Sequence, residues 1–457
     1  MSVPPMFICS GQLEHLYVPY MTILREIKER LTPVSASPWT VYLASLTSTA
    51  TQKTKSRMSE ILEKSSFDRL ITAVMDSWMD QGGEAISARQ ICGRAGTPVS
   101  SLYHHFGSLE RLLACSHEAA QAQTRLWCGR WIEELSGFDA PPSALGPFFA
   151  AVVDDWTNVQ RRHAFAWREG QLWRTESDVA AGVRDGWRTI WTDFWKAACA
   201  RFGLGERAWL IERFHDAESF NHMIRWRRPI DRAGLDEFAR GAAAWAAGER
   251  PPASPWRDLA RNEAVANAPV SPELDGTTMR VAAAAAALIE ESGPAAITHR
   301  AVAEHAGLTL GVVSHKLRTK AELLQAGFES IYLDAVARFR ERQPSIPTGN
   351  RGAALDAIAD LLAASLGGRG MDALCLAVAR DPALEAFGLQ LRYMRGTTSR
   401  GLLALLRPEL PTPSHLEAAL LSAFLTAVSR RLAYASPEDA APAIRLEVEA
   451  LIDLLPC

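Results

Sequence analysis

The feature that most constrains the fold of this chain is an internal repeat. Residues 91–106 read ICGRAGTPVSSLYHHF, and residues 302–317, which lie 211 positions further along, read VAEHAGLTLGVVSHKL. An offset held without a gap through four expected helices indicates duplication of one structural unit. The positions that are identical at this offset include the pairs Gly82/Gly293, Ile86/Ile297, Arg89/Arg300, Ala95/Ala306, Gly96/Gly307, His104/His315 and Leu112/Leu323.

The composition is typical of a globular protein and argues against a zinc-binding or disulfide-rich one. The 457 residues suffice for two to three domains, and a hydrophobic share of 48% is ordinary for a globular protein. The formal net charge of -3 gives no global sign of nucleic-acid binding. The seven cysteines include no Cys-x-x-Cys pair. Neither a zinc site nor a disulfide framework is therefore expected, and a cytoplasmic location without membrane contact is predicted.

Hydrophobic periodicity and capping signals predict four helices in the first copy. Apolar residues from Phe67 to Trp78 share one helical face, and Gly82-Gly83 ends that helix. Ser87-Ala-Arg-Gln90 has the form of a capping box, which predicts a second helix that ends at Ala95-Gly96. Thr97 is expected to cap a third helix with Pro98 in its first turn, and Ser108 is expected to cap a fourth.

The second copy repeats the same signals. Thr298 is expected to cap the second helix of this copy, Ala306-Gly307 to form the turn, and Thr309 to cap the third helix. Thr319-Lys-Ala-Glu322 predicts a capping box for the fourth helix. No stretch of the chain has convincing strand alternation, so an all-α fold is predicted.

Composition shifts and the repeat together predict six segments. Prolines break up residues 1–57, so this segment is expected to be poorly structured, or not native if translation starts at Met58. Residues 250–274 are rich in proline, alanine and polar residues and are expected to form a linker. The remaining expected segments are a first DNA-binding domain at 58–124, a helical ligand-binding or interface domain at 125–249, a divergent second DNA-binding domain at 275–335 and a helical interface domain at 336–457.

Two helices joined by a three-residue turn that contains glycine form a helix-turn-helix, whose second helix enters the DNA major groove. The motifs span residues 87–106 and 298–317. Residues early in the second helix reach base edges, and hydroxyl and imidazole groups at its end can contact phosphates. In the first copy the candidate DNA-binding residues are Ser87, Thr97, Pro98, Ser100, Ser101, Tyr103, His104 and His105.

Residues 66–113 resemble the DNA-binding domain of the TetR family of bacterial transcriptional regulators. The resemblance rests on the apolar first helix, the Ile-Ser start of the second, Ala-Gly in the turn and Leu-Tyr-x-x-Phe at the end of the third. Residues 277–324 resemble it less closely. The resemblance implies two tandem TetR-like repeats, each with a three-helix DNA-binding domain followed by a helical ligand-binding and dimerisation domain.

The two copies depart from the family pattern at different places. The family has a lysine at the start of its fourth helix, where the first copy has Leu109 and the second has Lys320. Positive charge is expected to contact phosphates from other positions instead. The further DNA-binding candidates are Lys53, Lys55 and Arg57 before the first copy, and Thr298, Thr309, Ser314, His315, Lys316, Arg318 and Lys320 in the second. The alternative for the second copy is a helix-turn-helix that is only scaffold, because Gly311, Val312 and Val313 offer few base-reading groups.

Tryptophans distinguish the two C-terminal halves, since twelve of the fourteen lie between Trp127 and Trp256. Because Trp187, Trp191 and Trp195 are spaced by four residues, they share a helical face, and Trp156, His163 and Trp167 nearly share another. Two such faces are candidates for binding a flat, apolar or aromatic effector, while packing in the core is the alternative.

Each copy is expected to end in two helices with apolar stripes that need a partner. In the second copy the first stripe includes Leu416, Leu420 and Phe424. Pairing of the two copies within one chain would make a covalent pseudo-dimer, and pairing between two chains is the alternative.

These features predict a ligand-responsive transcriptional regulator that binds a double-stranded DNA operator and acts as a repressor. The alternative is an interaction protein that does not bind DNA or binds with one copy only. No phosphate loop, metal-ligand spacing or nucleophile with a supporting base is recognisable, so neither an enzyme nor a cofactor is expected.

Overall fold

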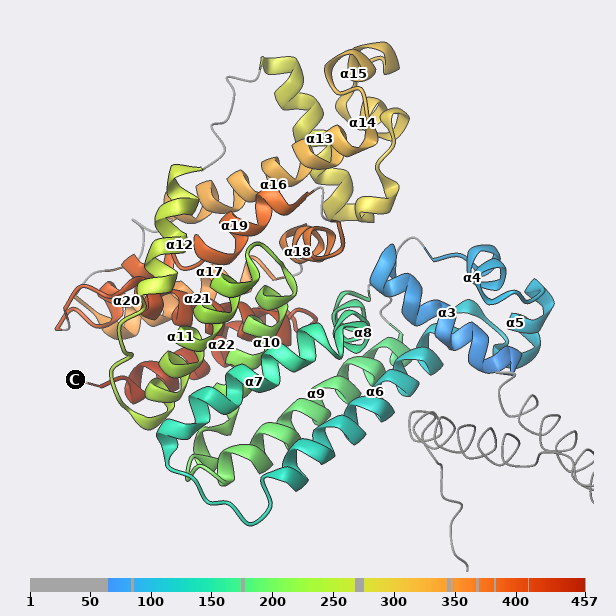
Figure 1. Ribbon diagram of the computed structural model, residues 1–457. Coiled ribbons are helices and arrows are strands. Elements are labelled where there is room, and N and C mark those ends of the chain that lie inside the picture. The colour runs from blue at the N-terminus through green and yellow to red at the C-terminus, as the bar shows by residue number, and fades with distance from the viewer. Residues whose placement is uncertain are drawn as a thin grey trace, which may run out of the picture. The chain divides into compact units, whose positions relative to one another are not determined.

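The structure, a computed structural model, consists of helices in the part of the chain that it describes, with no strand there (Figure 1). The prediction of an all-α fold is confirmed for this part. The candidates Lys53, Lys55 and Arg57 lie outside the described residues. The structure describes residues 65–83, 86–173, 177–267, 275–342, 347, 349–366, 370–381, 384–409 and 411–456.

The helices before the expected linker, together with the first helix inside it, follow one another with short connections. The helices are α3 (Ser66–Asp80), α4 (Ala88–Ala95), α5 (Val99–Phe106), α6 (Leu109–Glu134), η2 (Pro142–Ala144), α7 (Leu145–Asn158), α8 (Arg161–Leu172), α9 (Asp178–Ala200), η3 (Gly205–Arg207), α10 (Ala208–Met223), α11 (Arg228–Ala247) and α12 (Pro255–Ala266).

The remaining chain forms a second series of helices. They are α13 (Gly276–Ser292), η4 (Pro294–Ala296), α14 (His299–Ala306), α15 (Leu310–Lys316), α16 (Lys320–Arg342), α17 (Arg351–Ala363), α18 (Gly370–Arg380), α19 (Glu385–Tyr393), α20 (Ser399–Leu406), α21 (His415–Arg431) and α22 (Pro437–Leu454).

Most of the predicted helix caps are confirmed. Ser87 forms a capping box with Gln90 at the start of α4, and the hydroxyl of Ser108 accepts a hydrogen bond from Arg111 N at the start of α6. Thr298 and Thr309 cap α14 and α15 through their side chains. The predicted box at Thr319 is also present, because Glu322 N donates to the Thr319 hydroxyl (3.1 Å) and Thr319 N donates to the Glu322 carboxylate (3.3 Å).

The predicted cap at Thr97 is wrong by one position. The residue that caps α5 is Pro98, and it makes no side-chain hydrogen bond. Thr97 N donates to Cys92 O (2.9 Å), as Leu308 N does to Ala303 O (2.9 Å), so Thr97 and Leu308 occupy corresponding places in the two turns. Thr97 is 9% exposed, because this place faces inward.

The expected linker is not structureless, because Pro255–Ala266 form the helix α12. Its first turn is capped from another helix. The carboxylate of Glu237, on α11, accepts hydrogen bonds from Trp256 N and Arg257 N, both at 2.8 Å. Ala260 and Ala264 of α12 are buried together with Leu389 and Tyr393 of α19. The expected linker therefore contains a helix that packs against α11 and α19.

Both segments with the helix-turn-helix signatures enclose apolar side chains, and these clusters continue into neighbouring helices. We call residues 66–124 the first head and residues 275–335 the second head. Aromatic and aliphatic side chains fill the first head, whereas the buried side chains of the second head are mostly aliphatic. The buried residues are Leu70, Val74, Trp78, Ile91, Leu102, Phe106 and Leu112 in the first head, and Val281, Ala285, Ile289, Ile297, Val302, Val313 and Leu323 in the second.

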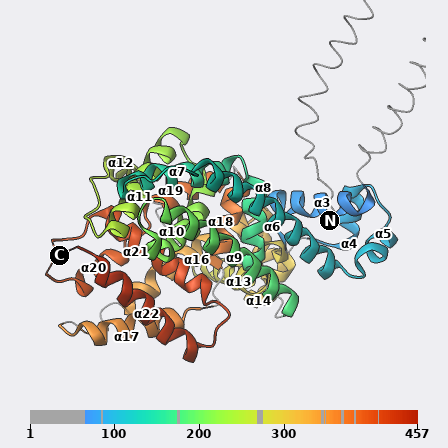
Figure 2. The ribbon, with the colours of Figure 1, turned by 90° about the horizontal axis from the view of Figure 1, so that it is seen from below.

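Helix α21 packs on α10 and α11, and the three helices lie side by side in both views (Figures 1 and 2). Glycine permits this close approach. A methyl group at Gly241 would lie 3.0 Å from Leu416 Cδ2 and 3.1 Å from Leu420 Cδ1. The rings of Trp209, in the first turn of α10, and Phe424 of α21 meet edge to face with centroids 5.9 Å apart. The apolar stripe predicted on α21 is therefore buried against helices from the first half of the chain.

A chain of ion pairs crosses the same contact. Arg168 of α8 binds Asp216 of α10 (2.6 Å), Asp216 binds Arg430 of α21 (3.3 Å), and Arg430 binds Asp372 of α18 (2.7 Å). Burial by itself would raise the pKa of Asp216, but the guanidinium groups of Arg168 and Arg430 outweigh burial and hold that pKa below its usual range. The four charges thus neutralise one another where water is largely excluded.

None of the helices described here is both long enough and apolar enough to cross a membrane.

Candidate nucleic-acid interface

Each head contains two short helices joined by a turn in which glycine has a left-handed backbone. Gly96 ends α4 with φ 60° and ψ 40°, and Gly307 ends α14 with φ 63° and ψ 37°. A residue with a Cβ adopts this conformation at a cost, so glycine is favoured at both sites. The turn fixes α5 against α4 and α15 against α14, which leaves one side of α5 and of α15 outside the core of its head.

Helix α5 divides its side chains between the core and the surface. Leu102 and Phe106 are buried, whereas Ser100, Tyr103 and His104 are exposed. Tyr103 is 54% exposed although it is aromatic. An exposed hydroxyl, an exposed phenol and an exposed imidazole on one short helix are the groups that contact base edges and phosphates in DNA-binding helices.

The other candidates of the first head differ in exposure and in their hydrogen bonds within the protein. The Ser87 hydroxyl donates to Gln90 Oε1 (2.7 Å) in the capping box, although the residue is exposed. His105 shares a hydrogen bond of 2.6 Å with the Ser66 hydroxyl and packs edge to face on the ring of Phe67. Pro98 is exposed, and Ser101 is only half-buried. Of the predicted contacts in this head, Thr97 is the one that the core hides.

Helix α15 of the second head presents fewer polar groups. Ser314 and His315 are exposed, as predicted for contact with DNA, but Gly311 and Val312 stand where the first head has Ser100 and Ser101. The hydroxyls of Thr298 and Thr309 accept hydrogen bonds from Ala301 N (3.1 Å) and Val312 N (3.4 Å), so both are used as caps.

The basic residues of the second head differ in how free they are. Lys316 forms an ion pair with Asp275 (2.7 Å), and the hydrogen bond from Lys316 holds the pKa of Asp275 below its usual range. Lys320 Nζ donates to Ala295 O (3.3 Å). Arg318 is exposed and forms no ion pair with a described residue. A phosphate would therefore have to displace Asp275 to reach Lys316, but not to reach Arg318.

Sequence reasoning did not count Arg89 and Arg300 among the DNA-binding candidates. They are one of the pairs that are identical at the 211-residue offset, and both are exposed in the first turn of the helix that precedes the turn. Helix α4 packs on α5 and α14 packs on α15, and arginine suits phosphate contact. The sequence signal that could have identified them is that both copies have arginine at this exposed position, although packing does not require the same residue there.

Thr97 allows a direct test of which hydroxyls face DNA. Its Oγ1 is buried and has no hydrogen-bond partner among the described residues, which costs about 1–3 kcal/mol. We expect Thr97→Val to raise the free energy of unfolding by about 1 kcal/mol in denaturant titrations and to leave DNA affinity unchanged. The matched variant Thr309→Val should instead lower stability by about 0.5–2 kcal/mol, because that hydroxyl caps α15. A loss of DNA affinity without a gain in stability in Thr97→Val would return Thr97 to the interface.

The tryptophans proposed as effector contacts lie inside the helical domain that follows the first head. Each of the five is at most 3% exposed: Trp156, Trp167, Trp187, Trp191 and Trp195. Their rings touch one another, with centroids 4.8 Å apart for Trp156 and Trp191 and also for Trp167 and Trp191. This arrangement fits the packing alternative, and a ligand would contact only those rings that also reach a cavity.

The histidines of this region are neutral. Burial and the neighbouring Arg162 lower the pKa of His163 to about 4, and its Nδ1 lies 3.2 Å from Gln160 Oε1. His215, which sequence reasoning did not select, is stacked on Trp167 with centroids 5.5 Å apart. Burial lowers the pKa of His215 to about 3. His163 thus has a partner at the domain surface, while His215 belongs to the tryptophan core.

One cavity, of about 240 Å³, reaches Trp167 and Trp191 from the side of α21. Most of the charged side chains in its wall form ion pairs. Arg213 binds Glu447 (2.9 Å), Arg431 binds Glu212 (3.4 Å), and Arg188 binds Asp185 (2.9 Å). The geometry brings two of the six predicted effector residues to this cavity and leaves Trp156, His163, Trp187 and Trp195 away from it.

The described residues contain no group of three or more histidine, cysteine, aspartate or glutamate side chains that could hold a metal ion. A scan against protein-family models and a search of curated protein sequences found no match to this chain.

Proposed function

We propose that this chain is a DNA-binding transcriptional regulator of the TetR type. It acts as a ligand-responsive repressor, and its two heads bind one operator. The observation that carries the proposal is the surface of α5. Ser100, Tyr103 and His104 are exposed on a helix that is held by buried Leu102 and Phe106 behind a left-handed glycine. A helix so positioned fits the DNA major groove.

Tandem repetition is supported by the order of helices after each head. In this proposal α7, α8, α10 and α11 would correspond to α17, α18, α21 and α22, and the long α9 to α19 and α20 together. Because α10 and α11 pack on α21 within one chain, the two repeats meet through the helices that TetR-type regulators use to dimerise. We therefore infer a covalent pseudo-dimer.

The alternative, in which the second head is only scaffold, is favoured by particular contacts. Lys316 is paired with Asp275, Lys320 with Ala295 O, and the first turn of α15 exposes Leu310 and Val312 instead of hydroxyls. In that case only the first head would contact DNA.

Selection of bound duplexes from a randomised DNA library tests the proposal. We expect the intact chain to enrich one sequence class. Ser100→Ala should change the preferred bases, because Ser100 faces the groove, whereas Ser136→Ala, an exposed serine after α6, should change nothing. Tyr103→Phe removes only a hydroxyl and should weaken binding about two- to tenfold on all sequences. A chain that enriches no sequence does not have the proposed function.

A further inference from the structure

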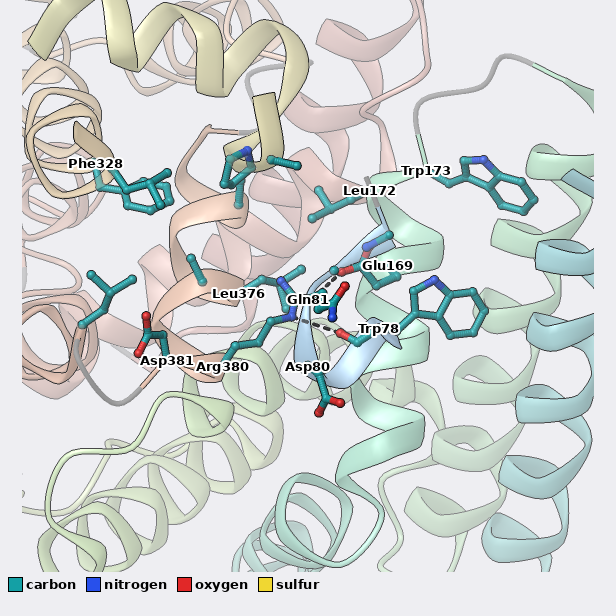
Figure 3. Close-up of a pocket in the computed structure, with 18 of the residues that line it drawn as sticks. Trp78, Asp80, Gln81, Glu169, Leu172, Trp173, Phe328, Leu376, Arg380 and Asp381 are labelled. Atoms are coloured by element: carbon teal, nitrogen blue, oxygen red, sulfur yellow. Dashed lines mark hydrogen bonds and ion pairs between the residues drawn. The ribbon is translucent and has the colours of Figure 1, made fainter. Parts of the chain in front are cut away.

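A cavity of about 400 Å³ lies where the two heads meet the helices α8 and α18. Figure 3 shows its centre, where Glu169 and Arg380 point toward each other, with Trp78 and Trp173 on one side and Phe328 on the other. Most of its wall is apolar. This cavity does not include any of the residues that the sequence indicated as effector contacts.

Equivalent positions of the two heads face this cavity. At the 211-residue offset, Leu113 corresponds to Leu324 and His117 to Phe328, and all four residues line it. Leu113 and His117 are on α6, whereas Leu324 and Phe328 are on α16. A molecule in the cavity would therefore touch the same surface of both heads at once.

His117 is the unsatisfied polar group of the wall. It is 2% exposed, and its Nδ1 has no hydrogen-bond partner among the described residues. Its ring is stacked on Trp78, with centroids 4.1 Å apart, and lies 5.5 Å from the centroid of Trp173. Burial lowers the pKa of His117 to about 3, so the ring is neutral at physiological pH. A neutral imidazole can exchange one hydrogen bond with a hydroxyl or a carbonyl group.

The charged groups of the wall have partners within the protein. Arg380 forms an ion pair with Glu169, and its Nε donates to Trp78 O (3.0 Å). Glu169 also accepts a hydrogen bond from Gly83 N (2.9 Å). Asp80 is paired with Arg94 (2.5 Å). A charged ligand would have to break one of these pairs, whereas an uncharged one would not.

We propose that this cavity binds an uncharged, mainly apolar ring compound that carries one hydroxyl or carbonyl group directed at His117. By touching α6 and α16 together, the bound molecule fixes the position of one head relative to the other. The consequence for DNA binding rests on the function proposed above, with an expected change in operator affinity of about 5- to 150-fold.

Calorimetric titration of the full chain with 2-naphthol and with naphthalene tests the site without DNA. We expect 2-naphthol to bind at one site per chain and more tightly than naphthalene, which lacks the hydroxyl. Leu324→Trp, which fills the cavity from the second head, should weaken both probes at least about tenfold. The control Leu310→Trp places the same side chain on the exposed face of α15 and should leave both affinities unchanged.

The variant His117→Phe tests the hydrogen bond to His117 separately from the size of the cavity. Phenylalanine already stands at the corresponding position 328, so the substitution is compatible with this wall. The preference for 2-naphthol over naphthalene should disappear in this variant while naphthalene binds as before. Equal affinity of the intact chain for the two probes, or wild-type binding by Leu324→Trp, would overturn the proposal, as would absence of binding heat for both probes.

If circular dichroism shows that either variant does not fold, hydrogen exchange on the unmodified chain tests the site instead. Saturating 2-naphthol should protect peptides that cover residues 78–83 and 320–328, and protection confined to residues 187–195 would place the ligand in the tryptophan core instead. Probe binding by a chain that forms no DNA complex would support this site and contradict the proposed function. DNA binding by a chain that ignores both probes would overturn the site alone.

Discussion

Asp216→Asn is expected to lower the free energy of unfolding by about 3–5 kcal/mol, since removal of one member of a buried ion pair leaves its partner uncompensated. The side chain of Arg168 is only 1% exposed, and its charge is neutralised by Asp216 at 2.6 Å. Arg430 keeps its second partner, Asp372. The cost therefore falls chiefly on Arg168, and denaturant titration of the variant measures it.

The matched control is Asp236→Asn. Asp236 is paired with Arg240 at 3.1 Å on the surface of α11, where both side chains are more than one third exposed. Such pairs contribute little, so a change within about 0.5 kcal/mol is expected. Equal effects of the two substitutions would show that the pairs crossing from α8 and α10 to α18 and α21 do not hold the halves of the chain together.

The same carboxylate predicts how stability depends on pH. Arg168 and Arg430 hold the pKa of Asp216 below its usual range against the opposing effect of burial. A depressed pKa in the folded state contributes stability that is fully present above the ordinary aspartate pKa of about 4. That contribution is lost as the pH falls through the folded-state value. The stability of Asp216→Asn should accordingly fall less than that of the intact chain during acidification.

Local signals in the sequence were sufficient for most helix ends. Ser87, Thr298 and Thr309 each bind backbone groups within three residues, so their caps depend on few neighbours. Thr97 was misplaced because two adjacent residues can both precede a helix. Which of them caps it depends on how the turn packs, and Thr97 turns inward as Leu308 does.

Tertiary contacts explain what sequence reasoning missed. Helix α12 is capped by Glu237, which lies on another helix, so no local cap marked its start. The cavity between the heads brings Trp78, His117 and Glu169 together with Arg380, although more than two hundred residues separate the last two. The tryptophans at 187, 191 and 195 were correctly predicted to share a helical face, but spacing alone does not distinguish a core from a pocket wall.

We expect one chain to bind one operator, and the two half-sites of that operator to differ in sequence. An ordinary dimer of this type presents two identical recognition helices about one DNA turn apart. Here α5 exposes Ser100 and Tyr103, whereas the corresponding positions of α15 are Gly311 and Ser314. Identical half-sites would therefore not suit both helices. Light scattering should give the mass of one chain in solution, and a titrated complex should contain one chain for each duplex.

Scrambling the half-sites one at a time measures how the two heads share the operator. Loss of the sequence read by α5 should cost about 3 kcal/mol or more, a hundredfold or more in affinity, because several base contacts disappear together. Loss of the sequence under α15 should cost about tenfold or less, since the exposed groups there mainly suit phosphates. Equal losses from either half-site, in an assembly that always contains two chains, would contradict the pseudo-dimer. They would mean that the contact of α10 and α11 with α21 organises a single subunit and leaves the pairing of recognition helices to a second chain.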